Sequence, residues 1–364
     1  MNTLTHRLML AAILMAGMLS SQPLHAAATV AVGTCQSTTP HYATIQQAVN
    51  AVSYGGTVLV CPGNYGEQVI ITQSLTLKGI ASGKAQAATI VTPGNGMTLS
   101  FTSPSIANVT AHLYIQSANP VTISNMSIQG EGVGCPLAYS EVGIASINSN
   151  TTVINTAIRH ISSPEANCFG VALFEESSGV LNVQGSSING FENGLWNIDG
   201  SGTISSNFFS DGLAGISYDQ ATAPVTISGN TFQTIGCPST CTTPSGTAIV
   251  FAAVGNSSIV NNTIGLTPMA DTGIFWDGSA TVTGNKISGG VYGMQMQNAK
   301  NSTVQSNILT NSAVGLKLID GTAGSNVITK NTFKYSSCGL WTVATVGDTL
   351  TPNTYLNNNY STCP

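Results

Sequence analysis

Short apolar segments recur along this chain, and most of them follow one template. An apolar residue is followed, after two spacers, by a position that is most often asparagine, and after one more spacer by a second apolar residue. The stretch "VTISGNTFQTIG" (residues 225–236) is an example, and "ATVTGNKISGG", "STVQSNILTNS" and "NVITKNTFKYS" repeat it. Such repetition indicates an architecture of stacked repeats.

Nine copies of the template can be aligned. The first apolar position holds Ile123, Val153, Val183, Ile204, Ile227, Ile259, Val282, Val304 and Ile328. The second holds Ile128, Ile158, Ile188, Phe209, Phe232, Ile264, Ile287, Leu309 and Phe333. The polar position between them holds Met126, Thr156, Ser186, Asn207, Asn230, Asn262, Asn285, Asn307 and Asn331.

A glycine, once replaced by alanine, leads a short apolar strand after each copy. These residues are Gly143, Gly170, Gly194, Gly215, Ala248, Gly273, Gly293, Gly315 and Gly339. Short β-branched segments without helical periodicity favour β coils over leucine-rich or ankyrin repeats. In a parallel β solenoid the strands of successive rungs lie about 4.8 Å apart, so the asparagines are predicted to stack as an internal hydrogen-bonded ladder.

The first residues have the pattern of a secretory signal. His6 and Arg7 precede the apolar run "LMLAAILMAGML", and small residues follow at positions 26–28. We expect residues 1–28 to be a signal peptide, residues 29–364 to form a single domain, and the mature protein to be secreted or periplasmic. No segment reaches the roughly 18 consecutive apolar residues that a membrane span requires.

Composition limits the function classes. Only 6% of the residues are charged, against about 25% in an average domain, while 42% are hydrophobic. A nucleic-acid-binding protein would need a basic face, and a disordered chain would have fewer hydrophobic residues. We expect a monomer that binds no nucleic acid and requires no cofactor.

The eight cysteines fit an oxidising compartment. Their order favours pairing between neighbours, which is one choice among about 105 connectivities. The expected pairs are Cys35 with Cys61, Cys135 with Cys168, Cys237 with Cys241, and Cys338 with Cys363. A zinc or copper site is disfavoured because no CxxC motif occurs and Met, His and Cys are not clustered.

The repeat and the segment "YATIQQAVNAVSYGGTVLVCPGNYGEQVIITQSLTLKG" (residues 42–79) resemble the right-handed parallel β-helix proteins of the pectin-lyase-like superfamily. The resemblance implies an all-β solenoid of roughly twelve rungs with a capping helix at residues 44–52. The segment is also similar to the opening of pectin methylesterases and of periplasmic copper-insertion accessory proteins. The esterase motifs "QDTL" and "DFIFG", the polygalacturonase motifs "GHG" and "RIK", and the pectate-lyase motif "WIDH" are all missing.

Insertions mark one corner of the coil as the working side. In five of the nine copies the glycine comes six residues after the second apolar position, and in the others it comes 15, 12, 16 and 9 residues after it. These insertions are residues 130–142, 160–169, 236–247 and 266–271. We expect them to form one wall of a groove, although exported solenoids can also carry loops without function.

Two sets of residues are candidates for catalysis. Arg159 and His160 precede the second insertion and have the chemistry of a polysaccharide lyase, in which a cation neutralises a uronate and a base removes a proton. They lie near Glu131, Glu141 and Glu165, and simple ion pairing is the alternative.

The second set is a column of acidic residues after the glycine-led strands: Glu175, Asp199, Asp219, Asp277 and Asp320. Asp199 and Asp219 fall on successive rungs, about 5 Å apart, as in a retaining glycosidase. Carboxylates in such a column could also bind Ca²⁺. The alternative is turn-forming Asp, because Asp199, Asp277 and Asp320 each precede a glycine.

Aromatic residues accompany this column and fit a carbohydrate track. They are Trp196, Tyr218, Phe275, Trp276, Tyr292 and Trp341. Strand alternation predicts that part of them fill the core. The first hypothesis is an exported protein that binds, and in one version cleaves, a polysaccharide as a lyase or glycoside hydrolase. The alternative is a non-catalytic exported scaffold or surface-interaction protein.

Overall fold

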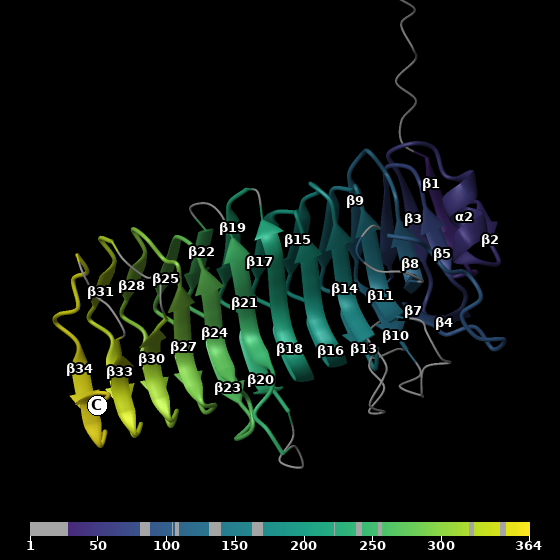
Figure 1. The fold of residues 1–364 in the computed structure, drawn as a ribbon. Coiled ribbons are helices and arrows are strands. Elements are labelled where there is room, and N and C mark those ends of the chain that lie inside the picture. Colours follow the sequence, from purple (N-terminus) through teal and green to yellow (C-terminus); the bar gives the residue numbers. More distant parts are fainter. Residues whose placement is uncertain are drawn as a thin grey trace, which may run out of the picture.

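The computed structural model describes residues 28–80, 88–103, 105, 109–130, 140–161, 170–221, 223–237, 242–253, 257–319, 324–342 and 347–364. In these residues the chain coils into a parallel β-helix whose strands stack side by side along one long axis (Figure 1). The predicted all-β solenoid is confirmed. The predicted signal peptide lies, except for its last residue, outside the described residues.

Each full coil contributes a strand to three faces, which we call A, B and C. Face A is a 13-stranded sheet that carries the first apolar column. Its strands are β1 (Thr29–Val32), β2 (His41–Tyr42), β3 (Gly56–Val60), β6 (Leu75–Gly79), β9 (Val121–Ser124), β12 (Thr151–Ile154), β15 (Leu181–Gln184), β17 (Gly202–Ser205), β19 (Val225–Ser228), β22 (Ser257–Val260), β25 (Ala280–Thr283), β28 (Thr303–Gln305) and β31 (Val327–Thr329).

Face B carries the second apolar column. Its strands are β4 (Gly63–Gly66), β7 (Ala88–Val91), β10 (Met126–Gln129), β13 (Ala157–Arg159), β20 (Thr231–Ile235), β23 (Thr263–Leu266), β26 (Lys286–Ser288), β29 (Ile308–Thr310), β32 (Thr332–Lys334) and β34 (Thr354–Leu356). Two long strands, β16 (Ser187–Ile198) and β18 (Phe208–Ala221), run through face B and continue into face C.

Face C carries the glycine-led strands. They are β5 (Val69–Ile71), β8 (Val109–Ile115), β11 (Ser140–Ile147), β14 (Gly170–Glu176), β21 (Thr247–Ala253), β24 (Thr272–Asp277), β27 (Tyr292–Gln297), β30 (Val314–Leu318), β33 (Cys338–Trp341) and β35 (Tyr360–Thr362). Together with the second halves of β16 and β18, these strands give face C twelve rungs within the described part of the chain.

The asparagine ladder lies inside the turn between faces A and B. The side-chain Oδ1 of Asn230 accepts from the backbone N–H of Asn207 at 3.0 Å, and Asn262 does the same for Asn230 at 2.9 Å. Each Nδ2 donates to a face A carbonyl of the preceding rung, as Asn262 does to Ile227 at 3.0 Å. The pattern continues to Asn353, and it satisfies polar groups that would be costly to bury unpaired. The predicted ladder is confirmed.

The glycines of face C stand where the rungs approach most closely. A Cβ on Gly194 would lie 2.6 Å from the carbonyl oxygen of Gly215, and a Cβ on Gly273 would lie 2.5 Å from that of Gly293. The register corrects one alignment, because Val142 pairs with Val171 and Ile144 with Leu173. Ala172, and not Gly170, therefore occupies the glycine position of its rung.

A short helix closes the amino-terminal end of the core. α2 (Ile45–Ala51) is capped by Thr44, whose side chain accepts from the Gln47 N–H. The carboxylate of Glu67 accepts from the N–H groups of Ile45 and Gln46 at 2.7 and 2.9 Å. Ile45, Ala48 and Val49 belong to the same hydrophobic core as the first strands, so the helix predicted at residues 44–52 caps the solenoid.

Two of the expected disulfides are confirmed. Cys35 is bonded to Cys61 near the capping helix, and Cys338 is bonded to Cys363 in the last coils. Cys237 is also disulfide-bonded. The expected partners Cys135, Cys168 and Cys241 lie outside the described residues, so those two pairings stay predictions. No helix in the described part of the chain is long and apolar enough to cross a membrane.

Candidate functional site

The outward side of face C changes from covered to open along the solenoid. Tyr114, Ala145 and Phe174 occupy the central outward position on β8, β11 and β14, and all three are buried. From β16 onward the position opens at every rung except that of Gln295, which is buried, and its occupants are in register: Trp196, Ser217, Val250, Phe275, Gln295, Lys317 and Trp341. We call this column and the outward residues beside it the lane.

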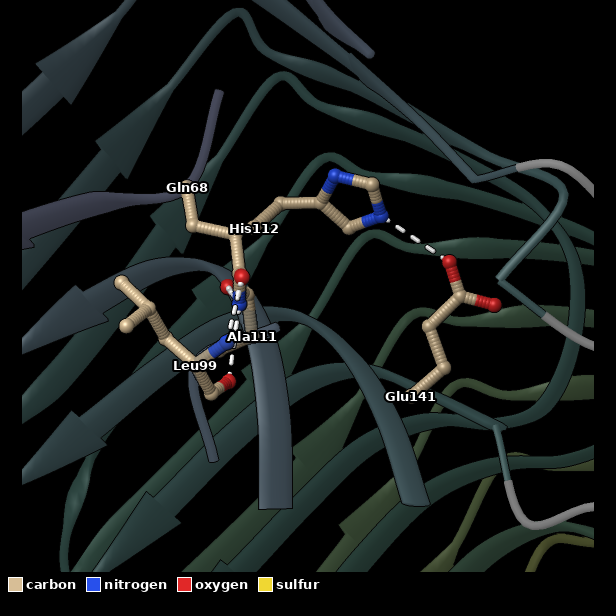
Figure 2. Close-up of polar contacts among 5 residues, drawn as sticks. All are labelled: Gln68, Leu99, Ala111, His112 and Glu141. Atoms are coloured by element: carbon tan, nitrogen blue, oxygen red, sulfur yellow. Dashed lines mark hydrogen bonds and ion pairs between the residues drawn. The ribbon is translucent and has the colours of Figure 1, made fainter. Parts of the chain in front are cut away.

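A segment that precedes β8 covers the closed end. The ring of Phe101 stacks on Tyr114 with centroids 3.7 Å apart. Gln68 holds the segment in place, because its Nε2 donates to the carbonyls of Leu99 and Ala111 at 2.9 and 3.1 Å (Figure 2). Its Oε1 accepts from the N–H of Leu99 at 2.8 Å. The lane therefore begins after β14.

The lane combines aromatic rings with hydrogen-bonding side chains. Trp196 packs edge-on against Phe174, and its Nε1 donates to Asp219 Oδ2 at 2.8 Å. Asp219, Ala252, Asp277 and Gln297 form the neighbouring outward column. Asn298 Nδ2 donates to Asp277 Oδ2 at 3.2 Å. Rings that are flanked by carboxylates and amides suit the apolar faces and hydroxyl edges of sugars.

A lysine lies between two rings at the far end of the lane. The Nζ of Lys317 is 4.8 Å from the ring centroid of Tyr292 and 4.6 Å from that of Trp341. Both distances fall within the range of a cation–π interaction. Trp341 remains 36% exposed, so its ring is available for contact with a ligand.

The corner between faces B and C contains a hollow beside the lane. β16 and β18 pass this corner without an insertion, whereas insertions follow β10, β13, β20 and β23 in the sequence. The hollow has a volume of about 360 Å³ and is lined mainly by Phe191, Leu213, Thr234 and Thr267, with Asp211 among its polar groups. Asn189 Nδ2 donates to Asp211 Oδ2 at 2.7 Å.

A histidine–glutamate pair lies at the same corner near the closed end. His112 Nε2 and Glu141 Oε1 are 2.9 Å apart, with His112 fully buried and Glu141 20% exposed (Figure 2). A Cβ on Gly130 would lie 2.6 Å from that Glu141 oxygen. Glycine at position 130 thus leaves space for the pair. His112 was not a sequence candidate, because an isolated histidine carries no motif.

Arg159 and His160 are neighbours of this pair along the corner. Arg159 ends β13 and is exposed, and its carbonyl accepts from the Gly130 N–H at 3.0 Å. His160 is exposed and has a φ of 54°, which turns the chain at the corner. Glu131 and Glu165 lie outside the described residues, so the expected acidic surroundings can be described only for Glu141.

The predicted acidic column is wrong in its register. Asp219 pairs with Ile198, so Asp199 is offset by one residue and lies in the turn after β16 with a φ of 61°. The two residues are still linked, because the Asp199 N–H donates to the Asp219 carbonyl at 3.0 Å. Asp219 and Asp277 do share a column, two rungs apart, and Asp320 lies outside the described residues.

Glu175 points into the core and not toward the lane. It pairs with Asn197, which pairs with Tyr218, and all three are fully buried. Burial raises the pKa of Glu175 to about 9, and the nearby Gly179 N–H and Asn197 side chain offset only part of this. Burial also raises the pKa of the Tyr218 hydroxyl. Tyr218 and Trp276 therefore fill the core.

The predicted sites separate into two groups. Arg159 and His160 precede β14, and Asp199 follows β16, at the opposite end of face C. The seven residues of β14, at about 3.3 Å each, span roughly 20 Å, so the two groups do not form one catalytic site. No cluster of three metal-ligating side chains occurs among the described residues. The Ca²⁺ site stays a prediction.

Comparisons with known proteins identify the fold. The sequence profile of a family described as "Right handed beta helix region" matches residues 199–360. The chain has the right-handed parallel β-helix fold of the pectin-lyase-like type. Its similarity to pectin methylesterases at the amino-terminal end is not confirmed by these comparisons. No curated protein matches the sequence.

Three solved structures show the same fold at low sequence identity. The A-module of the mannuronan C-5 epimerase AlgE6 from Azotobacter vinelandii is 14% identical, with a TM-score of 0.55 over 88% of this chain and 94% of that chain. DFA-IIIase from Arthrobacter chlorophenolicus A6 without its lid is 14% identical, with a TM-score of 0.53 over 83% and 84%. A mutant of the periplasmic alginate epimerase AlgG is 11% identical, with a TM-score of 0.52 over 82% and 77%.

Proposed function

We propose that this protein is an exported polysaccharide-binding protein and that a glycan chain lies along the lane. The observation that carries the proposal is the open column of rings and polar groups from Trp196 to Trp341. Successive rungs lie about 4.8 Å apart, so an extended glycan that follows the lane would meet a new side chain at each rung. The three compared structures are named for enzymes of carbohydrate chemistry, which supports the choice of ligand.

Export is part of the proposal. The signal-like sequence at residues 1–28 and the disulfides Cys35–Cys61 and Cys338–Cys363 agree with a secreted or periplasmic protein. A single domain over residues 29–364 and a monomeric state are proposed with it. The low proportion of charged residues favours a partner that is not a nucleic acid.

Cleavage is a second candidate function at the corner beside the lane. Arg159 and His160 are exposed there and could meet a uronate and its proton. Glu192, on β16 between the hollow and the lane, has a pKa that burial raises and that a hydrogen bond from the Gly170 N–H partly lowers. A carboxyl group with a raised pKa is suited to general acid catalysis.

The test is a binding and turnover measurement on oxidised protein. Calorimetry with a panel of soluble polysaccharides should give saturable binding that falls at least about tenfold in Phe275→Ala and Trp341→Ala. Tyr54→Ala is the matched control, because Tyr54 is a 60% exposed ring outside the lane.

Turnover is followed in parallel by reducing ends and by the ultraviolet absorbance of unsaturated products. Product formation that Arg159→Ala or His160→Ala abolishes would identify a lyase, whereas loss in Glu192→Gln alone would identify a hydrolase. Binding without turnover would leave a carbohydrate-binding scaffold. Absence of binding to every glycan would contradict the proposed function and favour a partner of another class.

A further inference from the structure

The lane and its borders contain more acidic than basic groups. Within the described lane, Asp219 and Asp277 are the carboxylates and Lys317 is the cation. At the corner beside it, the described residues Glu192, Asp211 and Asp271 are acidic. The exposed cation at this corner is Arg159, which ends β13, before the lane begins.

The single cation of the lane is already engaged. The Nζ of Lys317 lies within 4.8 Å of the ring centroids of Tyr292 and Trp341, and cation–π interactions with these rings already stabilise its charge. The other lysines of the carboxy-terminal rungs lie elsewhere: Lys286 and Lys334 are on face B, and Lys300 and Lys330 lie in turns next to face A. A polyanion on the lane would therefore meet one cation, Lys317, whose ammonium group two rings already contact.

The two carboxylates are held in place facing the ligand. Trp196 fixes Asp219 and Asn298 fixes Asp277, and both acids are half-buried. Charges in such a setting are less screened by solvent than fully exposed ones. The same oxygens retain free lone pairs, which can accept from sugar hydroxyl or ammonium groups.

We infer that the lane selects uncharged or cationic glycans and excludes polyuronates, so that of the two kinds of cleavage named above it favours the hydrolase over the uronate lyase. The inference rests on the proposed function and names the class of its ligand. Alginate, for which one of the compared epimerases is named, is a polyanion. The lane contains more carboxylates than cations, so its charge does not suit a polyanionic ligand. The shared fold therefore does not imply a shared ligand.

The experiment compares three probes of similar length by calorimetry: glucomannan oligosaccharides, chitosan oligosaccharides, and alginate or polygalacturonate oligosaccharides. The uncharged probe should bind at least about tenfold more tightly than the polyuronates at low salt. Asp277→Asn and the double variant Asp219→Asn with Asp277→Asn should reduce that ratio. Asp199→Asn is the matched control, because it removes a carboxylate from a turn outside the lane.

The outcomes separate the inference from the function beneath it. Tight polyuronate binding that weakens with salt and is lost in Lys317→Ala, but kept in Lys286→Ala, would overturn the inference and leave the lane as a glycan site. Absence of binding by all three probes would overturn both. A polyuronate that gains affinity in the double variant, while glucomannan affinity is unchanged, supports the inference directly.

Discussion

Trp196 Nε1 donates a hydrogen bond to Asp219 Oδ2 at 2.8 Å, across two adjacent rungs of face C. The bond joins the first open ring of the lane to its first carboxylate. Because both side chains are held by neighbours that the β-helix supplies, the ring has one preferred orientation toward solvent. A pre-organised ring loses less conformational entropy when a ligand binds.

The first prediction concerns this pair. Trp196→Ala should lower glycan affinity at least about tenfold, because it removes a contact surface of the lane. Asp219→Ala should have a smaller effect of about threefold, because it removes the group that orients the ring and one hydrogen-bond acceptor but leaves the aromatic surface. Calorimetry measures both. Equal losses in the two variants would contradict this, because they would show that the carboxylate contributes as much to binding as the ring.

The second prediction concerns the asparagine ladder. Asn262→Ala removes the acceptor for the Asn230 N–H and Nδ2, and also the donors to Ile227 and Asn285. Buried partners left unsatisfied should lower the free energy of unfolding by about 2–4 kcal/mol. Denaturant unfolding measures the change, with Thr281→Ala on the outward side of face A as control. A loss under about 0.5 kcal/mol would mean that water replaces the ladder.

The third prediction concerns pH and Glu175. Its pKa is raised to about 9 in the folded protein, so the carboxyl is neutral there while the unfolded chain ionises near its ordinary value. The stability that this group contributes is therefore complete below about pH 4.5 and is lost as pH rises toward 9. Glu175→Gln should raise the free energy of unfolding at neutral pH by about 1–3 kcal/mol.

Thermal unfolding from about pH 5 to pH 9 tests this, with Glu192→Gln as the comparison, since Glu192 is less buried. The wild-type transition should move downward with pH more steeply than that of Glu175→Gln. If the melting temperatures of the wild type and of Glu175→Gln changed in parallel with pH, Glu175 would be ionised in the folded protein.

The fourth prediction concerns the carboxy-terminal disulfide. Each rung contacts only its neighbours, so loss of the Cys338–Cys363 bond should act locally. In Cys338→Ala with Cys363→Ala, amide exchange should accelerate in β33, β34 and β35 and stay unchanged in β16 to β21. Closing a loop of this size is worth about 3 kcal/mol. Faster exchange along the whole solenoid would contradict local stability.

Much of the fold could be predicted from the sequence because each rung repeats the same steric demands. The asparagines recur where a side chain must pair with the next coil, and glycines such as Gly194 recur where a Cβ would meet a carbonyl. The helix at α2 was predictable from Thr44, which accepts from the Gln47 N–H as a capping residue does.

The site was less predictable because it depends on registers that the repeat does not fix. Asp199 and Asp219 look equivalent in the sequence, yet one lies in a turn and the other on a strand. Glu175 precedes Glu176 directly, and alternation sends the first into the core. His112 and Gln68 carry no motif, and only the three-dimensional contacts show what they hold.

The most direct test of the glycan lane is hydroxyl-radical footprinting read by mass spectrometry, with and without a bound oligosaccharide. Trp196, Phe275 and Trp341 should become protected, while Tyr54 and Tyr335, which are exposed outside the lane, should not change. The fully buried Trp276 serves as the internal reference. Protection at Tyr54 or Tyr335, with Trp196, Phe275 and Trp341 still modified, would contradict a glycan site on face C.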